Sequence, residues 1–190
     1  MPILGLASRR LAVTTLTARY GADAHFVDVT SRGPTPWVRF SPFYPHGAIP
    51  VPLSPGHTAV SVEGIWQGLK VFERADIDLA VMQNATMRGL KRTVARYGPV
   101  RGHRAGIAGD HCLPYDEARQ AIYLPAYRWV LDHALQPELA QLRRLAADRS
   151  VVLLDYETNA DPADLRRPLA HAALVLAYLQ DAWPQVALAG

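Results

Sequence analysis

The sequence predicts an α+β fold, a largely helical single domain with a few short strands. Apolar residues recur at helical spacing along most of the chain, whereas residues 150–156 form a continuous apolar run typical of a buried strand. The chain has 190 residues, of which 49% are hydrophobic, so it suits one domain with a core large enough to fold alone. We find no internal repeat and no interdomain linker, and we therefore expect one domain over residues 1–190.

The first third of the chain combines one predicted helix with two short predicted strands. Apolar spacing predicts a helix over residues 7–20, which Gly21 can end. Strand-forming residues predict strands over 25–30 and 37–40. Residues 41–56 contain five prolines. Because proline lacks an N–H and restrains the residue before it, we expect an irregular or edge-strand segment there.

The middle of the chain is predicted to form two helices and a loop. The first helix is mostly apolar and covers residues 61–72. Asn84 can cap the second helix, and Gly98 can end it. Residues 98–111 are rich in glycine, so we expect a loop there.

The last third is predicted to be mainly helical around the buried strand. Pro114 can open a helix over 115–135, which Pro125 should kink or divide. A further helix is expected over 137–147, and a final one over 168–180.

Composition and charge exclude several classes of protein. The net charge of +3 and the pI of about 9.2 are compatible with a nucleic acid or a phosphorylated ligand without requiring one. No apolar run approaches the roughly 20 residues that span a bilayer, and residues 1–10 place the apolar stretch before the charges, unlike a signal peptide. Because Cys112 is the only cysteine, an internal disulfide is impossible and we expect a cytoplasmic location.

The basic residues are strongly skewed towards arginine. Among 20 basic residues only Lys70 and Lys91 are lysines. Arginine stays protonated in proteins, whereas a buried lysine can lose its proton and act as a nucleophile. The two lysines are therefore candidates for chemistry that arginine cannot perform, and chance survival is the alternative.

Glu63, Gln67 and Lys70 share one face of the helix predicted over 61–72, because residues three or four apart align. The rest of this helix is apolar, which indicates burial, and a buried charge needs a partner or a cavity. A solvated polar stripe on an amphipathic helix is the alternative.

Gly64 and Gly68 each cost about 1 kcal/mol in a helix interior. Close approach of another backbone or of a ligand would explain both glycines.

Two segments, "RFSPFYPHGAIPV" and "SVEGIWQGLKVF", resemble in order and spacing the two leading motifs of the NADAR family. That family typically has Ser-Asn-Phe-Tyr-Pro, then Ser-Val-Glu-His and Gln-Ala-x-Lys-Phe. A weaker match follows over 136–161, where Asp155 and Asp161 are the counterparts of an acidic residue and an Asn/Asp loop. The residues that match the leading motifs are Ser41, Phe43, Tyr44, Pro45, Ser61, Val62, Glu63, Gln67 and Lys70.

The chain departs from the family pattern at several places. Pro42 replaces Asn, Gly64 replaces His, and the family's Trp-Gly-x-Gly after the Asp loop is absent. Residues 1–35 have no clear counterpart and form a family-divergent N-terminal extension.

The resemblance implies an α+β, largely helical single domain that hydrolyses N-glycosidic bonds. Substrates of the family include ADP-ribosylated guanine in nucleic acid and ribosylamino-pyrimidine phosphates. Its motif lysine is thought to attack the anomeric carbon of ribose and to hold it as a Schiff base. By this resemblance Lys70 is the nucleophile, Glu63 the acid/base and Asp161 an assisting carboxylate.

These roles make chemical sense and also conflict. Cleavage passes through an oxocarbenium-like centre, which needs a nucleophile and an acid for the leaving base. Lys70, if desolvated, can be neutral near pH 7, but an ionised Glu63 close by would raise the pKa of the amine. The two groups therefore need separation or one shared proton.

A second set of residues is expected to bind substrate. Aromatic rings can stack a base and guanidinium groups can fork onto phosphate, although core packing and solvated surface arginines are the alternatives. The predicted substrate-binding residues are Phe43, Tyr44, Arg39, Arg32, Gln67 and Asp155.

We expect no metal and no cofactor. The seven histidines form no HxxxH or HExxH, and the grouping of His103, His111 and Cys112 lacks the spacing of a structural zinc site. Walker, GxGxxG and Gly-x-Ser-x-Gly motifs are absent.

The sequence thus predicts an N-glycosidase acting on a ribosyl or ADP-ribosyl linkage, either on nucleic acid or in a small molecule, with no membrane partner. Two alternatives stay open: a non-catalytic module that binds ADP-ribose or a nucleotide, and a structural or interaction protein that keeps only the fold.

Overall fold

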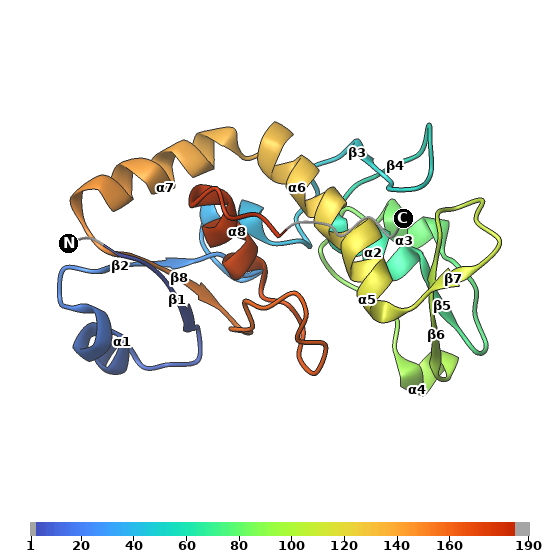
Figure 1. Ribbon diagram of the computed structural model, residues 1–190, viewed down its shortest axis with the longest axis horizontal. Helices are drawn as coiled ribbons and strands as arrows, with labels where there is room; N and C mark the ends of the chain where they lie inside the picture. The colour runs from blue at the N-terminus through green and yellow to red at the C-terminus, as the bar shows by residue number, and fades with distance from the viewer. Residues whose placement is uncertain (1–2, 185–190) are drawn as a thin grey trace. The chain divides into compact units, whose positions relative to one another are not determined.

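The computed structural model describes residues 3–184 and confirms the α+β class, with about 37% helix and 16% strand (Figure 1). Contacts along the chain divide it into two compact units. The described part of unit 1 comprises residues 3–41 and 135–184, and unit 2 comprises residues 42–134. The single domain over 1–190 stays a prediction.

Unit 1 is built on a three-stranded parallel sheet in the order β1-β8-β2. Its strands are β1 (Leu4–Ser8), β2 (His25–Asp28) and β8 (Val151–Asp155), and Figure 1 shows β8 between the other two. Val151, Val152 and Leu153 are fully buried, and alternate residues face opposite sides of a sheet. The apolar run of β8 therefore packs on both faces, as a central parallel strand requires.

Four helical segments accompany this sheet. They are α1 (Val13–Tyr20), the 3₁₀ helix η1 (Trp37–Phe40), α7 (Gln136–Asp148) and α8 (His171–Leu179). Leu16 of α1 packs on Ala7 and Val152, while α7 and α8 contact β8.

Two predicted elements in this unit were wrong, and a third begins later than expected. The helix expected over 7–20 starts only at Val13, because the residues up to Ser8 join the sheet beside β8. Trp37–Phe40 is not a strand but a 3₁₀ turn, in which the rings of Trp37 and Phe40 stack at 6.3 Å and are buried. The final helix begins at His171 rather than at Pro168.

Unit 2 contains two small antiparallel sheets. The first pairs β3 (Ile49–Pro50) with β4 (Thr58–Ala59). The second has the order β5-β6-β7, formed by β5 (Lys70–Phe72), β6 (Val100–Arg104) and β7 (Cys112–Leu113). The glycine-rich residues 98–111 are therefore not all loop, because β6 pairs with strands on both sides.

The helices of unit 2 are short except for one long run. They are α2 (Val62–Gly68), α3 (Leu79–Met82), α4 (Val94–Tyr97), α5 (Tyr115–Ala118), the π helix η2 (Arg119–Tyr123) and α6 (Leu124–His133). The last three are consecutive. The chain stays helical across Pro125, because the residues before it, Arg119–Tyr123, form a π helix that leads directly into α6.

The helix expected from Asn84 to Gly98 was wrong over most of its length. The Asn84 side chain instead accepts the Thr86 N–H at 2.8 Å and donates to the Arg88 carbonyl, which closes a local turn. Met87 then has a φ of 57°, so the backbone leaves the helical region. Only Val94–Tyr97 is helical, and Gly98 ends it with a φ of 81°.

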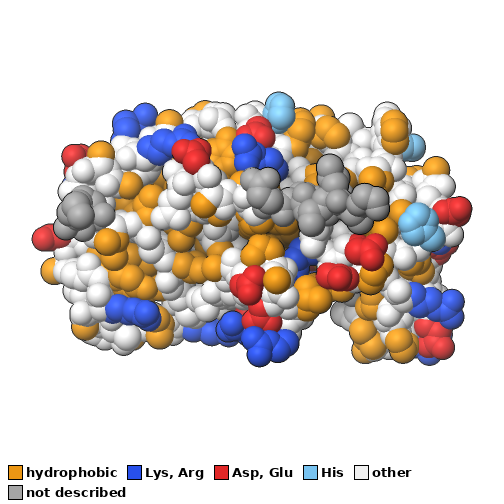
Figure 2. All heavy atoms as spheres, in the orientation of Figure 1, with side chains coloured by type: hydrophobic (Ala, Val, Ile, Leu, Met, Phe, Trp, Pro, Cys, Tyr) orange, Lys and Arg blue, Asp and Glu red, His pale blue; other side chains and the backbone are white. Residues whose placement is uncertain are grey.

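Charged side chains are interspersed on the face drawn in Figure 2, where Lys and Arg lie among Asp and Glu without a continuous basic band. Within residues 3–184, no helix has the length and apolar character to cross a membrane.

Candidate functional site

The helix α2 is buried on nearly all sides, as its composition predicts. Ser61 caps it by accepting the Gly64 N–H at 3.0 Å, and the Glu63 N–H donates to the Pro42 carbonyl at 2.8 Å. The side chains of Glu63 and Gln67 are not a solvated stripe, because these residues are only 7% and 5% exposed.

Gly64 and Gly68 allow α3 to pack directly against α2. A Cβ on Gly64 would lie 3.1 Å from the Val81 carbonyl oxygen, and a Cβ on Gly68 would lie 3.0 Å from the Asp78 carbonyl oxygen. The two glycines are therefore explained by close approach of a neighbouring backbone. A larger residue at position 64 would require the α3 backbone to shift.

We expected Lys70 to lie on α2, and this prediction was wrong. The helix ends at Gly68, and Lys70 is the first residue of β5. The polar chain nevertheless forms. Gln67 Nε2 donates to Glu63 Oε1 at 2.9 Å, and Lys70 Nζ donates to Gln67 Oε1 at 3.4 Å. The carboxylate and the amine are thus joined through an amide, which separates the two groups.

A backbone donor fixes the orientation of the Gln67 amide. The Arg92 N–H donates to Gln67 Oε1 at 3.1 Å, and a backbone N–H can only be a donor. The amide oxygen must therefore face Arg92 and Lys70, which leaves the amide NH₂ for Glu63.

Arg92 is a buried cation beside this chain. Its guanidinium donates to the carbonyl oxygens of Gln67 at 3.2 Å, Lys70 at 2.6 Å and Asp76 at 2.6 Å. The residue is 8% exposed, so these bonds tie the end of α2 to β5 without solvent.

The environment lowers the pKa of Lys70 below its ordinary value of 10.5. Burial is the largest cause, the charge of Glu63 opposes it, and the positive charges of Arg92 and Lys91 add to it. A lowered pKa increases the fraction of neutral amine, which is the nucleophilic form.

A cluster of rings centred on Trp66 lies next to Lys70. The Trp66 ring stacks on the His103 imidazole with centroids 3.7 Å apart, and Lys70 Nζ lies 5.8 Å from the Trp66 centroid. Tyr115 and Tyr123 meet the same indole edge-on at 5.7 Å each. Trp66 is therefore part of an internal cluster, although it remains half-exposed.

Sequence reasoning missed His103 except as a weak metal candidate. It is 1% exposed and is the direct partner of Lys70 in the β5–β6 pair. Burial, followed by the charge of Lys70, lowers the pKa of His103 to about 3. Only a prediction of β6 and its register with β5 could have identified this residue.

Phe43 and Tyr44 also belong to unit 2 and are half-buried. Lys91 Nζ lies 5.7 Å from the Phe43 centroid, and the Tyr44 ring lies 4.9 Å from that of His46. Their substrate-binding role stays a prediction.

The two predicted phosphate-binding arginines belong to unit 1. Arg39 forms an ion pair with Glu138, whereas Arg32 is exposed. Asp155 is buried, and its carboxylate contacts His171 Nδ1 at 2.9 Å and accepts the backbone N–H groups of Tyr156 and Ala172. These contacts stabilise the start of α8, and the predicted substrate roles of all three residues stay predictions.

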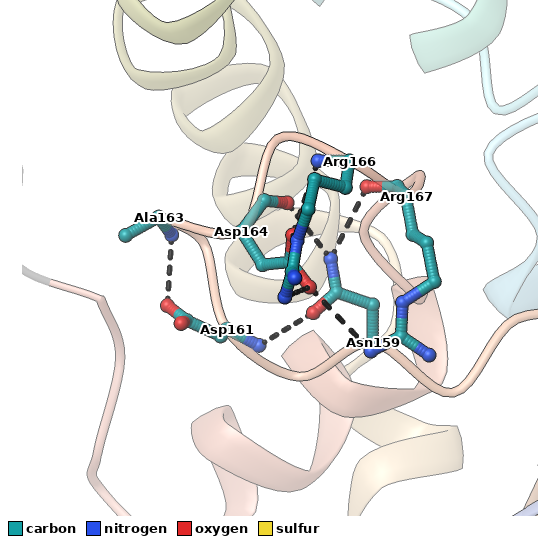
Figure 3. Close-up of polar contacts among 6 residues, drawn as sticks. All are labelled: Asn159, Asp161, Ala163, Asp164, Arg166 and Arg167. Atoms are coloured by element: carbon teal, nitrogen blue, oxygen red, sulfur yellow. Dashed lines mark hydrogen bonds and ion pairs between the residues drawn. The ribbon is translucent and has the colours of Figure 1, made fainter.

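Asp161 lies in an exposed loop of unit 1 that is held by its own side chains (Figure 3). Its carboxylate accepts the Ala163 N–H at 2.8 Å, and its own N–H donates to Asn159 Oδ1 at 3.0 Å. In the same loop, Arg166 lowers the pKa of Asp164 to about 2. The carboxylate of Asp161 thus organises a turn, and its assisting role at Lys70 stays a prediction.

Among residues 3–184, no group of three or more His, Cys, Asp or Glu side chains is placed to hold a metal ion. The structure therefore assigns no metal ligands to the described part of the chain.

The arrangement in unit 2 defines a candidate site centred on a lysine, built from the end of α2 and the first residue of β5. The model of DUF6939, a family of unknown function, matches residues 8–175, and the chain belongs to that family. Neither the comparison with curated proteins nor that with solved structures gives a match.

Proposed function

We propose that the chain is an N-glycosidase that cleaves a ribosyl or ADP-ribosyl N-glycosidic bond through a Schiff base on Lys70. The single observation that carries the proposal is the half-buried amine, whose lowered pKa accompanies a fixed Glu63–Gln67–Lys70 chain. The resemblance to the NADAR motifs supplies the substrate class, and the lone cysteine supports a cytoplasmic location.

The proposed reaction assigns one task to each side chain. With the proton that the two groups share on Glu63, the neutral Lys70 amine attacks the anomeric carbon and the bond to the base breaks. The base takes the proton from Glu63, which becomes a carboxylate. The sugar ring then opens to a protonated Schiff base, which water hydrolyses to free sugar and amine, and the released proton returns to Glu63. Gln67 holds its neighbours apart and in place, because an amide exchanges protons too slowly to relay them.

The two lysines of the chain give a matched test. ADP-ribosylated guanine is incubated with the protein and sodium borohydride, and the mass of the protein is measured. The wild type and Lys91→Arg should gain the mass of a reduced sugar adduct, because Lys91 is exposed and arginine keeps its charge. Lys70→Arg should fold normally, as judged by circular dichroism, and should show neither adduct nor turnover. Normal turnover by Lys70→Arg would disprove the Schiff base.

One observation favours the second candidate, a non-catalytic module that binds ADP-ribose. Gly64 stands where NADAR proteins usually carry His, and a Cβ at this position would lie 3.1 Å from the Val81 carbonyl oxygen, so a histidine would require α3 to shift. Two measurements together distinguish the candidates. A non-catalytic module binds ADP-ribose in calorimetry but releases no product from the ADP-ribosylated substrate.

A further inference from the structure

His103 and Lys70 present their side chains on the same face of one small sheet. They are directly opposite residues of the antiparallel β5–β6 pair, so their Cβ atoms are about 4.5–5.5 Å apart. Both side chains meet the Trp66 ring, with the imidazole centroid at 3.7 Å and Lys70 Nζ at 5.8 Å. The side chains of Lys70 and His103 are therefore direct neighbours.

The imidazole has two polar atoms that the described part of the chain does not satisfy. His103 is 1% exposed, and neither Nδ1 nor Nε2 has a hydrogen-bond partner within residues 3–184. A neutral imidazole carries one N–H donor and one acceptor nitrogen. Buried polar groups are nearly always hydrogen-bonded because an unsatisfied one costs free energy, so this pair needs a water or a ligand group as partner.

We propose that His103 is a substrate-binding residue that hydrogen-bonds the sugar hydroxyl next to the anomeric carbon and so selects ribosyl over 2-deoxyribosyl substrates. This inference rests on the proposed function, because it places the anomeric carbon at Lys70 Nζ. The 2-hydroxyl is the hydroxyl on the carbon next to the anomeric carbon, and we therefore assign it to the side chain next to Lys70. A hydroxyl both donates and accepts, so it suits either nitrogen of the ring.

The test uses two free sugars that differ only at this position, ribose 5-phosphate and 2-deoxyribose 5-phosphate. Each aldehyde condenses with the Lys70 amine to an imine with loss of water. Sodium cyanoborohydride then delivers hydride to the imine and leaves a stable secondary amine. Peptide mass spectrometry gives the rate of adduct formation at Lys70. This rate is divided by the rate for free lysine with the same sugar, so that the intrinsic reactivity of each sugar cancels.

The relative rate of adduct formation in the wild type should be at least about tenfold higher for ribose 5-phosphate than for 2-deoxyribose 5-phosphate. A site that hydrogen-bonds a hydroxyl discriminates against an analogue that lacks it. His103→Leu should lose this preference while still forming adducts at Lys70. His103→Gln, which keeps a donor and an acceptor, should restore part of it. His111→Leu is the control on the same hairpin, because its side chain is 66% exposed, and it should retain the wild-type ratio.

The outcomes separate the two proposals. Adducts at Lys70 with equal rates for the two sugars in the wild type would overturn the role of His103 and leave the lysine chemistry standing. The same conclusion follows if His103→Leu keeps the wild-type ratio. Absence of any adduct at Lys70 with both sugars would overturn the lysine chemistry, and the role of His103 with it.

Discussion

Replacing His103 by leucine should change how the stability of the protein depends on pH. The pKa of His103 is lowered to about 3 by burial and then by the charge of Lys70. In the unfolded chain the same group has a pKa of about 6.5. On acidification below pH 6.5 the unfolded state therefore takes up a proton that the folded state does not, and the wild type loses stability as the pH falls.

The size of the effect follows from these two pKa values. The unfolded histidine is about 24% protonated at pH 7 and about 97% protonated at pH 5. Between these pH values the linkage relation gives a loss of about 2 kcal/mol from His103 alone. His103→Leu removes this loss, so the difference in unfolding free energy between the variant and the wild type should shift by about 2 kcal/mol in favour of the variant at pH 5.

Urea unfolding at pH 7 and pH 5 measures this difference, and hydrogen exchange of the β6 peptides assigns it to unit 2. Taking a difference between two proteins cancels the groups that they share. His111→Leu is the matched control and should leave the pH dependence as it is in the wild type. If the difference in unfolding free energy between His103→Leu and the wild type is the same at both pH values within about 0.5 kcal/mol, the His103 ring is not held neutral by burial.

Three further predictions concern the surroundings of the site and the core of unit 1. Gly68→Ala should lower the unfolding free energy by about 1–2 kcal/mol in urea, because the new Cβ overpacks the α2–α3 contact by more than alanine gains in helix propensity. Burial lowers the pKa of His171, but Asp155 outweighs it and the net pKa is raised. The wild type should therefore lose unit 1 stability as the pH rises through that pKa, and His171→Gln should not, as measured by hydrogen exchange of α8. Arg92→Gln should raise the pKa of Lys70 in a ¹³C NMR titration of labelled lysine, and an unchanged value would remove Arg92 as a cause.

The sequence is informative where a local pattern is enough to define a segment. The apolar run at β8 and the helical spacing that begins after Ser61 are such patterns, and both elements were predicted. The burial of the Glu63 carboxylate and the Gln67 amide was inferred from the sequence, because the other sides of their helix are apolar. The chemical candidate, Lys70, was identified by its rarity and by the motif around it.

Long-range pairing explains what the sequence could not predict. Residues 69–72 keep helical spacing, but pairing with β6 takes Lys70 out of the helix. The strand β6 contains Gly102, which has a φ of 146° and close contact with Leu113, so its local sequence resembles a loop. The position of His103 opposite Lys70 depends on both facts and has no local signal. Asp161 had a local signal, but side-chain capping of a turn gives the same pattern as a catalytic loop.

The charge of Glu63 has opposite effects on two species that the proposed reaction requires. These are the neutral Lys70 amine and the cations that form after it attacks. Its charge raises the pKa of Lys70 and so disfavours the neutral amine that must attack. The same charge stabilises the oxocarbenium-like centre and the protonated Schiff base that follow, because both are cations. Burial and the charges of Arg92 and Lys91 offset the first effect without removing the second, since the net pKa of Lys70 is still lowered. Glu63→Gln should therefore lower the pKa of Lys70 further and yet slow adduct formation. A variant that forms adducts faster than the wild type at pH 7 would show that Glu63 acts only on the resting amine.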